Sequence, residues 1–143
     1  MNQELYHGLI NPLVLKNQIG ENLSDEQEIY KENIIHHYKH PHNKGEIEHT
    51  KSHRELNTSC GDELTIYLNI KNNIIENISF TGHGCAISQA SVSMLTDKLK
   101  GMAVEEAQKV SKDDILTLLG IPISYVRMKC ALLSLKTVQG ALC

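Results

Sequence analysis

The sequence has no long apolar run, no excess of basic residues and only four cysteines in 143 residues. Its apolar segments fall well short of the roughly 20 residues that cross a bilayer as a helix, so we expect no membrane-spanning segment. Lys and Arg number 14 against 17 Asp and Glu, which gives a formal net charge of −3. Nucleic acids are bound mainly through clustered positive charge, so this composition removes the usual reason to expect nucleic-acid binding.

The N-terminus also lacks the marks of a secretory signal peptide. No basic segment precedes its apolar residues, and Asn11 and Pro12 interrupt them, so we expect a cytoplasmic protein. In a reducing compartment, four cysteines are more consistent with metal ligands or reactive thiols than with a disulfide framework. A length of 143 residues with 41% hydrophobic side chains suits one domain with its own core.

The first predicted element is a helix that starts after Ser24, a residue type favoured at helix N-caps, and ends before Pro41. Its predicted inward-facing residues are Ile29, Tyr30, Ile34 and Tyr38. A β-hairpin follows, because Leu64, Ile66, Leu68 and Ile70 alternate with polar residues and two asparagines at 72 and 73 separate this run from a second one, 74–80.

The second half of the chain reads as helical. Apolar spacing predicts a helix from about Cys85 to Gly101 and a short helix over 104–110. Ser111 and Asp114 form a possible capping pair for the next helix. A last helix is predicted from Pro122, because proline is favoured in the first helical turn, to about residue 139.

Three widely separated cysteines and one aspartate carry the chemistry. Cys60 and Asp62 flank Gly61, and in an extended chain residues two apart project to the same side. Cys85 follows a glycine-flanked turn at a predicted helix N-terminus, where the helix dipole favours a thiolate ligand. In the last helix, Cys130 falls about 130° from the centre of the apolar stripe, so we expect it away from the main core face.

The basic residues Arg127 and Lys129 precede Cys130 and are expected to favour its thiolate form. The alternative is a structural role, because any single free cysteine is more often a small core residue than a ligand. The cysteine spacing also matches no paired zinc-ribbon pattern. An oxygen ligand from Asp62 among soft sulfurs gives a more labile metal site, which suits temporary cargo.

Five motifs follow one another along the chain: IYKENIIHHYKHPHNKG, CGDEL, ISFTGHGCAISQASVSMLT, LKG and VRMKCALLSLKTV. In this order they resemble one known family, the IscU/SufU/NifU N-terminal iron–sulfur cluster assembly scaffolds, over roughly residues 28–140. It implies an α+β fold in which a small antiparallel sheet packs against several helices, with the site at one end. It also implies that Cys60, Asp62, Cys85 and Cys130 are the ligand set.

The same resemblance implies a function. Iron and persulfide sulfur from a cysteine desulfurase assemble into a [2Fe-2S] cluster, which then passes to apo iron–sulfur proteins or carriers, so that the chain is a scaffold rather than an enzyme. The alternative is a SufU-type sulfurtransferase in which these residues hold Zn²⁺ and Cys130 or a neighbouring thiol accepts the persulfide sulfur from the desulfurase. A third hypothesis, a structural zinc domain, is disfavoured by the aspartate ligand.

Two departures leave the branch of the family open. Lys129 stands where the IscU branch has a histidine, and GIPISYV replaces its chaperone-recruiting stretch. The SufU branch carries an additional segment between the second and third cysteines, whereas this chain has a short connection. Residues 1–24 match no family motif and are predicted to form an extension that covers the domain, self-associates or stays partly disordered, ahead of a single domain, 25–143.

The remaining polar candidates have weaker signals. Four histidines, at 36, 37, 40 and 42, crowd one helix end; we expect most of them to be solvated and His37 to be structural, so a second metal site is the less favoured interpretation. His83 either binds metal or occupies a turn. Cys143 is the last residue and is not expected to be a ligand.

Overall fold

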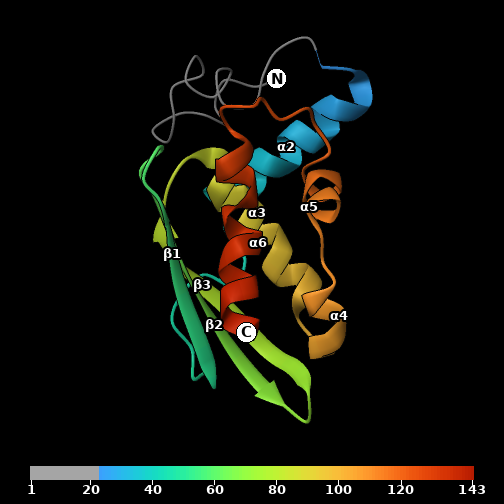
Figure 1. Cartoon of the computed structure of the whole chain (residues 1–143). Coiled ribbons are helices and arrows are strands. Elements are labelled where there is room, and N and C mark those ends of the chain that lie inside the picture. The colour runs from blue at the N-terminus through green and yellow to red at the C-terminus, as the bar shows by residue number, and fades with distance from the viewer. Residues whose placement is uncertain (1–22) are drawn as a thin grey trace.

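Three antiparallel strands form one sheet in the computed structural model, which describes residues 23–143. The strands are β1 (Lys51–Asn57), β2 (Asp62–Lys71) and β3 (Ile74–His83), and β2 lies between the other two (Figure 1). β2 and β3 form the predicted hairpin, and its two turn residues, Asn72 and Asn73, have φ angles of 52° and 64°. Asparagine tolerates this left-handed conformation, and two such residues make a tight turn that matches the twist of the strands.

β1 is the strand that the sequence analysis missed. It pairs with β2 from Lys51, opposite Leu68, to Asn57, opposite Asp62. Six of its seven residues are polar or charged, so the alternation of apolar residues that revealed β2 is lacking. This composition suits an edge strand, because charged side chains discourage pairing with another chain.

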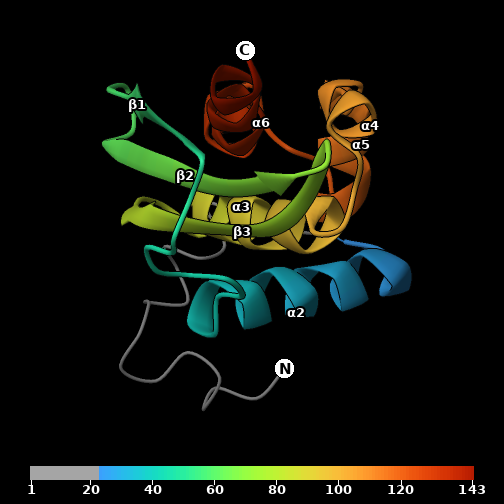
Figure 2. The ribbon, with the colours of Figure 1, turned by 90° about the horizontal axis from the view of Figure 1, so that it is seen from below.

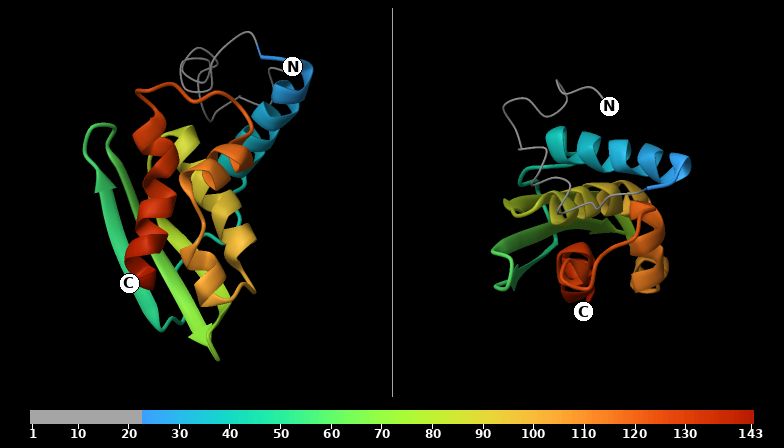
Figure 3. Two further views of the ribbon diagram at one scale, coloured as in Figure 1. Left: turned by 45° about the vertical axis from the view of Figure 1, so that its right-hand side comes forward. Right: turned by 90° about the horizontal axis from the view of Figure 1, so that it is seen from above.

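Five helices are present among the described residues: α2 (Asp25–Lys39), α3 (Ala86–Leu99), α4 (Val104–Gln108), α5 (Lys112–Leu119) and α6 (Met128–Leu142). α6 packs against β1, β2 and α3, and α3 also contacts β3, α2 and α5. Figures 2 and 3 show α3 between α2 and α6, with α6 over one face of the sheet. A small antiparallel sheet packed against several helices is the α+β fold that the sequence predicted.

The core lies where β2 and α3 meet the other helices. Leu64, Ile66 and Leu68 of β2 are fully buried, as their alternation predicted. α3 starts after Cys85 as predicted, and 12 of its 14 residues are buried. Its Ser91 hydroxyl donates to the carbonyl of Ala131 in α6 at 2.8 Å. Such a bond satisfies a polar group that would otherwise be buried without a partner.

α2 confirms the predicted cap and corrects the predicted inward face. Ser24 forms a capping box at its start. Ile34 is fully buried, and Tyr30 and Tyr38 pack against the core as predicted, whereas Ile29 is 70% exposed. Ile29 lies roughly 140° around the helix from the middle of the packed side, so it faces away from the core. The side of α2 that packs on the core consists of Tyr30, Ile34, Ile35, His37 and Tyr38.

The predicted start of the last helix is wrong. α6 begins at Met128 instead of Pro122, because a turn precedes it in which the Arg127 N–H donates to the Ser124 carbonyl at 3.0 Å. The two shorter helices, α4 and α5, form as predicted, and the expected capping box stands at the start of α5.

α6 also continues past the predicted end, through Gly140 to Leu142. A Cβ atom on Gly140 would come within 2.2 Å of the His53 ring. This glycine therefore allows α6 to pack closely on β1 and does not end the helix.

Residues 1–22 lie outside the described part of the chain. The extension predicted for residues 1–24 and the domain boundary at residue 25 therefore stay predictions. Within residues 23–143, no helix is both long enough and apolar enough to cross a membrane.

Candidate metal centre

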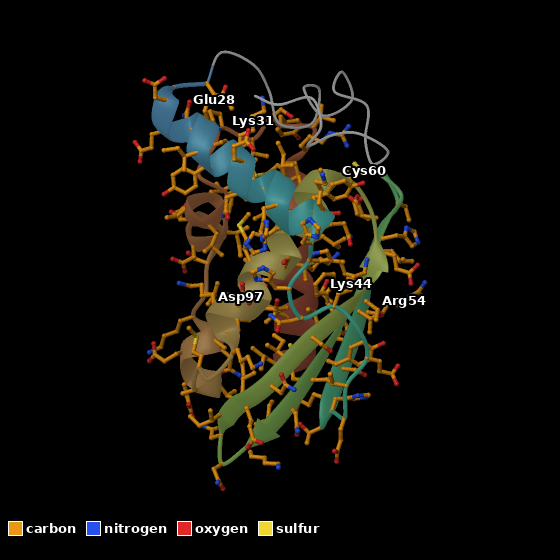
Figure 4. The ribbon with its side chains drawn as sticks, turned by 180° about the vertical axis from the view of Figure 1, so that it is seen from behind. Glu28, Lys31, Lys44, Arg54, Cys60 and Asp97 are labelled. Carbon is orange, nitrogen blue, oxygen red and sulfur yellow. The ribbon has the colours of Figure 1, made fainter. Side chains whose placement is uncertain are left out.

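The turn between β1 and β2 carries two of the predicted ligands. Its backbone bends through Gly61, at a φ of 70°, and the Cys60 N–H donates to the Asn57 carbonyl at 3.3 Å. Asp62 is the first residue of β2 and shares the inward face of that strand, since alternate residues point to one side. Its carboxylate is therefore held in the interior with 1% of the residue exposed, while Cys60 is half-buried. Figure 4 shows Cys60 at one end of the sheet.

Three donors hold the Asp62 carboxylate. The backbone N–H of Cys85 donates to Oδ1 at 2.9 Å, and the Ser88 hydroxyl donates to the same oxygen at 3.4 Å. The Asn57 amide donates to Oδ2 at 3.3 Å. Because Cys85 is the N-cap of α3, the carboxylate faces the end of a helix where negative charge is favourable. Asp62 thus joins the start of the central strand to the start of α3.

Gly84 makes this contact sterically feasible. A Cβ atom at Gly84 would lie 2.4 Å from Asp62 Oδ1 and 2.5 Å from the Ser88 hydroxyl. Both distances are far inside van der Waals contact, so any larger residue would displace the carboxylate. The glycine before Cys85 is therefore required by the position of the aspartate.

The structure brings three of the four predicted ligands directly together. One ligand atom from each of Cys60, Asp62 and Cys130 lies within 4.8 Å of the others. The Cys85 sulfur is outside this group, although its backbone N–H binds Asp62 and the residue is half-buried beside it. Two sulfurs and one carboxylate oxygen are ligands that suit zinc or iron.

Cys130 corrects two predictions. It was expected away from the core, yet it is fully buried, because the first turn of α6 lies against polar residues of the β1–β2 hairpin that an apolar stripe does not register. The Asn57 amide donates to its sulfur at 3.7 Å. Burial raises the pKa of the Cys130 thiol, and the hydrogen bond with Cys60 and the charges of Cys85 and Asp62 raise it further, so the expected thiolate is not favoured without a metal ion.

Arg127 supplies the positive charge of the site. Burial lowers its pKa, but the hydrogen bond with Cys130 and the charges of Cys85, Cys130 and Cys60 outweigh burial and raise the pKa overall. Its guanidinium is therefore placed to balance the negative charge of thiolates at this centre. Lys129 was also expected to favour a thiolate at Cys130, but its side chain is exposed.

Sequence reasoning missed two residues that organise the centre. Asn57 contacts both Asp62 and Cys130, and Ser88 donates to Asp62 and to the Cys85 carbonyl. Recognition of β1 would have paired Asn57 with Asp62 across the turn. The only indication for Ser88 in the sequence was its position, one helical turn after Cys85.

Two other candidates lie outside the centre. His83 is the last residue of β3, where it pairs with Glu63 across the sheet, so it lies in a strand instead of the expected turn. Its exposed ring lies 3.4 Å from the Glu63 carboxylate and is not among the grouped ligands. Cys143 follows α6 and stands 13 residues after Cys130, about 20 Å along a helix. It is exposed and is no part of the ligand group.

A cleft of about 390 Å³ adjoins the Cys60 turn. Residues of the turn and the outer side of α6 line it, among them Thr58, Ser59, Met128, Lys129 and Lys136. The Lys136 ammonium lies 3.7 Å from the Glu55 carboxylate. None of the four predicted ligands lines the cleft, which lies beside the turn that carries Cys60.

Residues 29–143 match the family model of the NifU-like N-terminal domain. The chain is 34% identical over 128 aligned positions to the zinc-dependent sulfurtransferase SufU of Bacillus subtilis, covering 78% of this chain and 87% of that protein. The 128 aligned positions outnumber the residues of this chain that the alignment covers, so the alignment contains gaps in this chain. The SufU protein therefore has residues with no counterpart here.

A second relative and a solved structure agree. The chain is 35% identical over 115 residues to the iron-sulfur cluster assembly scaffold protein IscU 1 of Archaeoglobus fulgidus, covering 80% of this chain and 74% of that protein. Its fold is similar to the crystal structure of a proposed iron-sulfur cluster assembly scaffold of the SUF system from Fervidobacterium islandicum, with a TM-score of 0.64 and 32% identity over 82% of this chain and 98% of that one. The chain belongs to the NifU-like N-terminal domain family.

Proposed function

We propose that the chain is a scaffold on which a [2Fe-2S] cluster is assembled from iron and desulfurase-derived sulfur and then transferred to apoproteins. The observation that carries this proposal is the approach of Cys60, Asp62 and Cys130 to within 4.8 Å of one another, next to Cys85 at the N-cap of α3. Relatives named as scaffold proteins support it. The cluster is the cargo, so its site must both hold and release it.

The four residues suit these two tasks. Thiolates are the usual ligands of iron–sulfur clusters, and Cys60, Cys85 and Cys130 supply three. Asp62 supplies an oxygen, which binds iron less strongly than a fourth thiolate and is the ligand that an incoming thiol displaces most readily. Arg127 offsets the negative charge that builds up as thiols lose their protons to ligation.

Sulfur arrives as a persulfide on a cysteine desulfurase. A cysteine thiolate of this chain attacks the outer sulfur, the sulfur–sulfur bond breaks and the desulfurase thiolate leaves, so the transfer needs no external oxidant. Conversion of the resulting persulfide to the sulfide of a cluster takes two electrons per sulfur from a separate electron-donor protein. Cys130 was predicted as the acceptor, and its burial requires the Cys60 turn to move aside first. The cleft beside that turn supports approach from this side.

The second candidate function is a zinc-dependent sulfurtransferase. Similarity to the SufU protein favours it, and Cys60, Asp62, Cys85 and Cys130 would hold Zn²⁺ in this case. Zinc lowers the pKa of a bound thiol and so keeps a cysteine nucleophilic. The residues of SufU that have no counterpart in this chain argue for the scaffold.

We further propose a cysteine desulfurase and apo iron–sulfur proteins or carriers as partners, and the cytoplasm as the compartment. All four cysteines are free, and free thiols of this kind persist in reducing compartments. Self-association through residues 1–24 is a separate expectation, which light scattering of the full chain against a chain lacking these residues would test.

Anaerobic reconstitution with iron and sulfide tests the function. The scaffold predicts visible charge-transfer bands and stoichiometric acid-labile sulfide, followed by transfer to an apo-ferredoxin. A colourless protein that retains one zinc ion and refuses iron would instead establish the sulfurtransferase. Metal analysis of the same sample distinguishes the two results.

A further inference from the structure

A second group of metal-ligating side chains lies where the end of α2 and the segment after it pack against α3. The His37 ring nitrogen Nδ1 lies 2.7 Å from the Ser93 hydroxyl, and the backbone N–H of His42 donates to the same hydroxyl at 2.8 Å. His42 Nδ1 in turn lies 2.5 Å from Oδ2 of Asp97. One serine of α3 therefore brings two histidines together above an aspartate of the same helix.

The three side chains converge on one point. One ligand atom from each of His37, His42 and Asp97 lies within 4.8 Å of the others. The rings of His37 and His42 are 4.4 Å apart, and His36 lies 5.7 Å from each of them. Such crowding of imidazoles is unfavourable when they are protonated and favourable when they share a cation.

Asn43 holds the second carboxylate oxygen of Asp97. The Asn43 amide donates to this oxygen, Oδ1, at 2.9 Å and to the Thr96 hydroxyl at 3.1 Å. Asn43 adopts a positive φ of 58° to reach this position. Hydrogen bonds to the far side of a ligand fix its direction and are typical of metal sites.

His37 is the buried member of the group. His37 is 7% exposed, and burial lowers its pKa, with the charges of His42 and His36 lowering it further and that of Asp97 opposing them. Asp97 and His42 are half exposed. A cleft of about 440 Å³, lined in part by His37 and Asp97, leaves room on the open side of the group for water or another ligand.

This group is separate from the cysteine centre. Asp97 follows Cys85 by 12 residues in one helix, about 18 Å along its axis. Figure 4 shows Asp97 and Cys60 well apart, on different elements. A cation at one site therefore shares no ligand with the other.

We propose that His37, His42 and Asp97 form a second metal site, which takes a divalent first-row transition cation such as Zn²⁺ or Co²⁺. Two imidazole nitrogens and one carboxylate oxygen are borderline ligands that suit these ions and disfavour Mg²⁺ and Ca²⁺, which prefer oxygen alone. Binding replaces the hydrogen bond between His42 and Asp97 by two metal bonds of about 2.0 to 2.2 Å each. Water fills the remaining positions.

Cobalt titration of the full-length chain tests the site. Thiolate ligation of Co²⁺ gives intense charge-transfer bands, whereas ligation by nitrogen and oxygen gives only weak visible bands, so the two sites are distinguished in one protein. If both sites bind, the wild type takes up two equivalents of Co²⁺. The equivalent at the cysteine centre gives thiolate bands, and the equivalent at His37, His42 and Asp97 gives none. Asp97→Asn and His42→Gln are each expected to weaken only this equivalent, by at least about tenfold.

Matched controls separate this site from adventitious binding. His49→Gln removes an exposed histidine outside the group, whose Nδ1 lies 2.7 Å from the Ile47 carbonyl, and is expected to leave both equivalents unchanged. A wild type in which all bound Co²⁺ shows thiolate bands overturns the proposal. So does loss of the second equivalent in His40→Gln together with its retention in Asp97→Asn, because the ion would then sit on the exposed imidazoles of α2.

Discussion

Adding one methyl group at residue 84 tests how the cysteine centre is built. In Gly84→Ala, the new Cβ atom would lie 2.4 Å from Asp62 Oδ1 and 2.5 Å from the Ser88 hydroxyl. Carbon and oxygen atoms in contact are normally more than 3 Å apart, so the carboxylate must shift by roughly 1 Å. This shift breaks its 2.9 Å hydrogen bond with the Cys85 N–H.

The expected cost follows from these contacts. Overpacking of a tight interior costs about 1 to 3 kcal/mol, and loss of a hydrogen bond to a charged group costs about 1.5 to 3 kcal/mol. The carboxylate can keep its bond with Asn57, so only these two costs add, and we expect a combined loss of about 2.5 to 6 kcal/mol in the free energy of unfolding. Displacement of the oxygen ligand should also weaken Zn²⁺ binding by about 10- to 100-fold.

Gly140→Ala is the matched control. It adds the same methyl group 2.2 Å from the His53 ring. Residue 140 lies near the C-terminal end of α6, whereas Cys130 of the centre lies near its N-terminal end. We expect it to lower stability without changing Zn²⁺ affinity. Urea denaturation and chelator competition on both variants give the two quantities. Wild-type zinc affinity in Gly84→Ala would refute the inference that contact with the start of α3 positions Asp62.

Three further predictions concern the ligands and one helix cap. Stable cluster or zinc binding should be lost, with the fold retained, in three variants measured by metal analysis: Cys60→Ala, Cys85→Ala and Cys130→Ala. Cys143→Ala is their control, and equal metal retention in all four would contradict a shared centre. Asp62→Ala should still form a cluster but transfer it to apo-ferredoxin more slowly, because no carboxylate can leave and return during ligand exchange; a lowered thermal midpoint with an unchanged transfer rate would assign Asp62 a structural role only. The backbone N–H of Ser111, and then its hydroxyl, lower the pKa of Asp114 below 3.8, so the carboxylate stabilises the fold above that pH. The difference in thermal midpoint between wild type and Asp114→Ala should therefore close as the pH falls below 3.8, and a difference independent of pH would contradict this assignment.

The elements with strong local signals were predicted from the sequence. Alternating apolar residues and two asparagines were enough for the β2–β3 hairpin, and the cap at Ser24 was enough for the start of α2. β1 was missed because an edge strand needs no apolar alternation. The start of α6 was misplaced because proline at residue 122 is equally compatible with the turn that precedes Met128.

The centre was predictable in its residues but not in its environment. Motif resemblance selected Cys60, Asp62, Cys85 and Cys130, and three of them meet. A helical wheel counts only apolar neighbours, so it could not show that polar groups such as Asn57 bury Cys130. The same limit applies to the histidines, whose convergence depends on the packing of α2 against α3 and on a shared serine hydroxyl.

The hydrogen bond between Asp62 and the N-terminus of α3 has a consequence for the fate of the protein in the cell. The ligands come from a hairpin turn, the central strand and the starts of two helices, so a bound cluster or ion ties these elements together. Any ligand that binds only the folded chain stabilises it by mass action. The unloaded chain, which lacks this added stability, is then expected to be the form that proteases degrade first, so that occupancy of the centre sets how long a molecule survives.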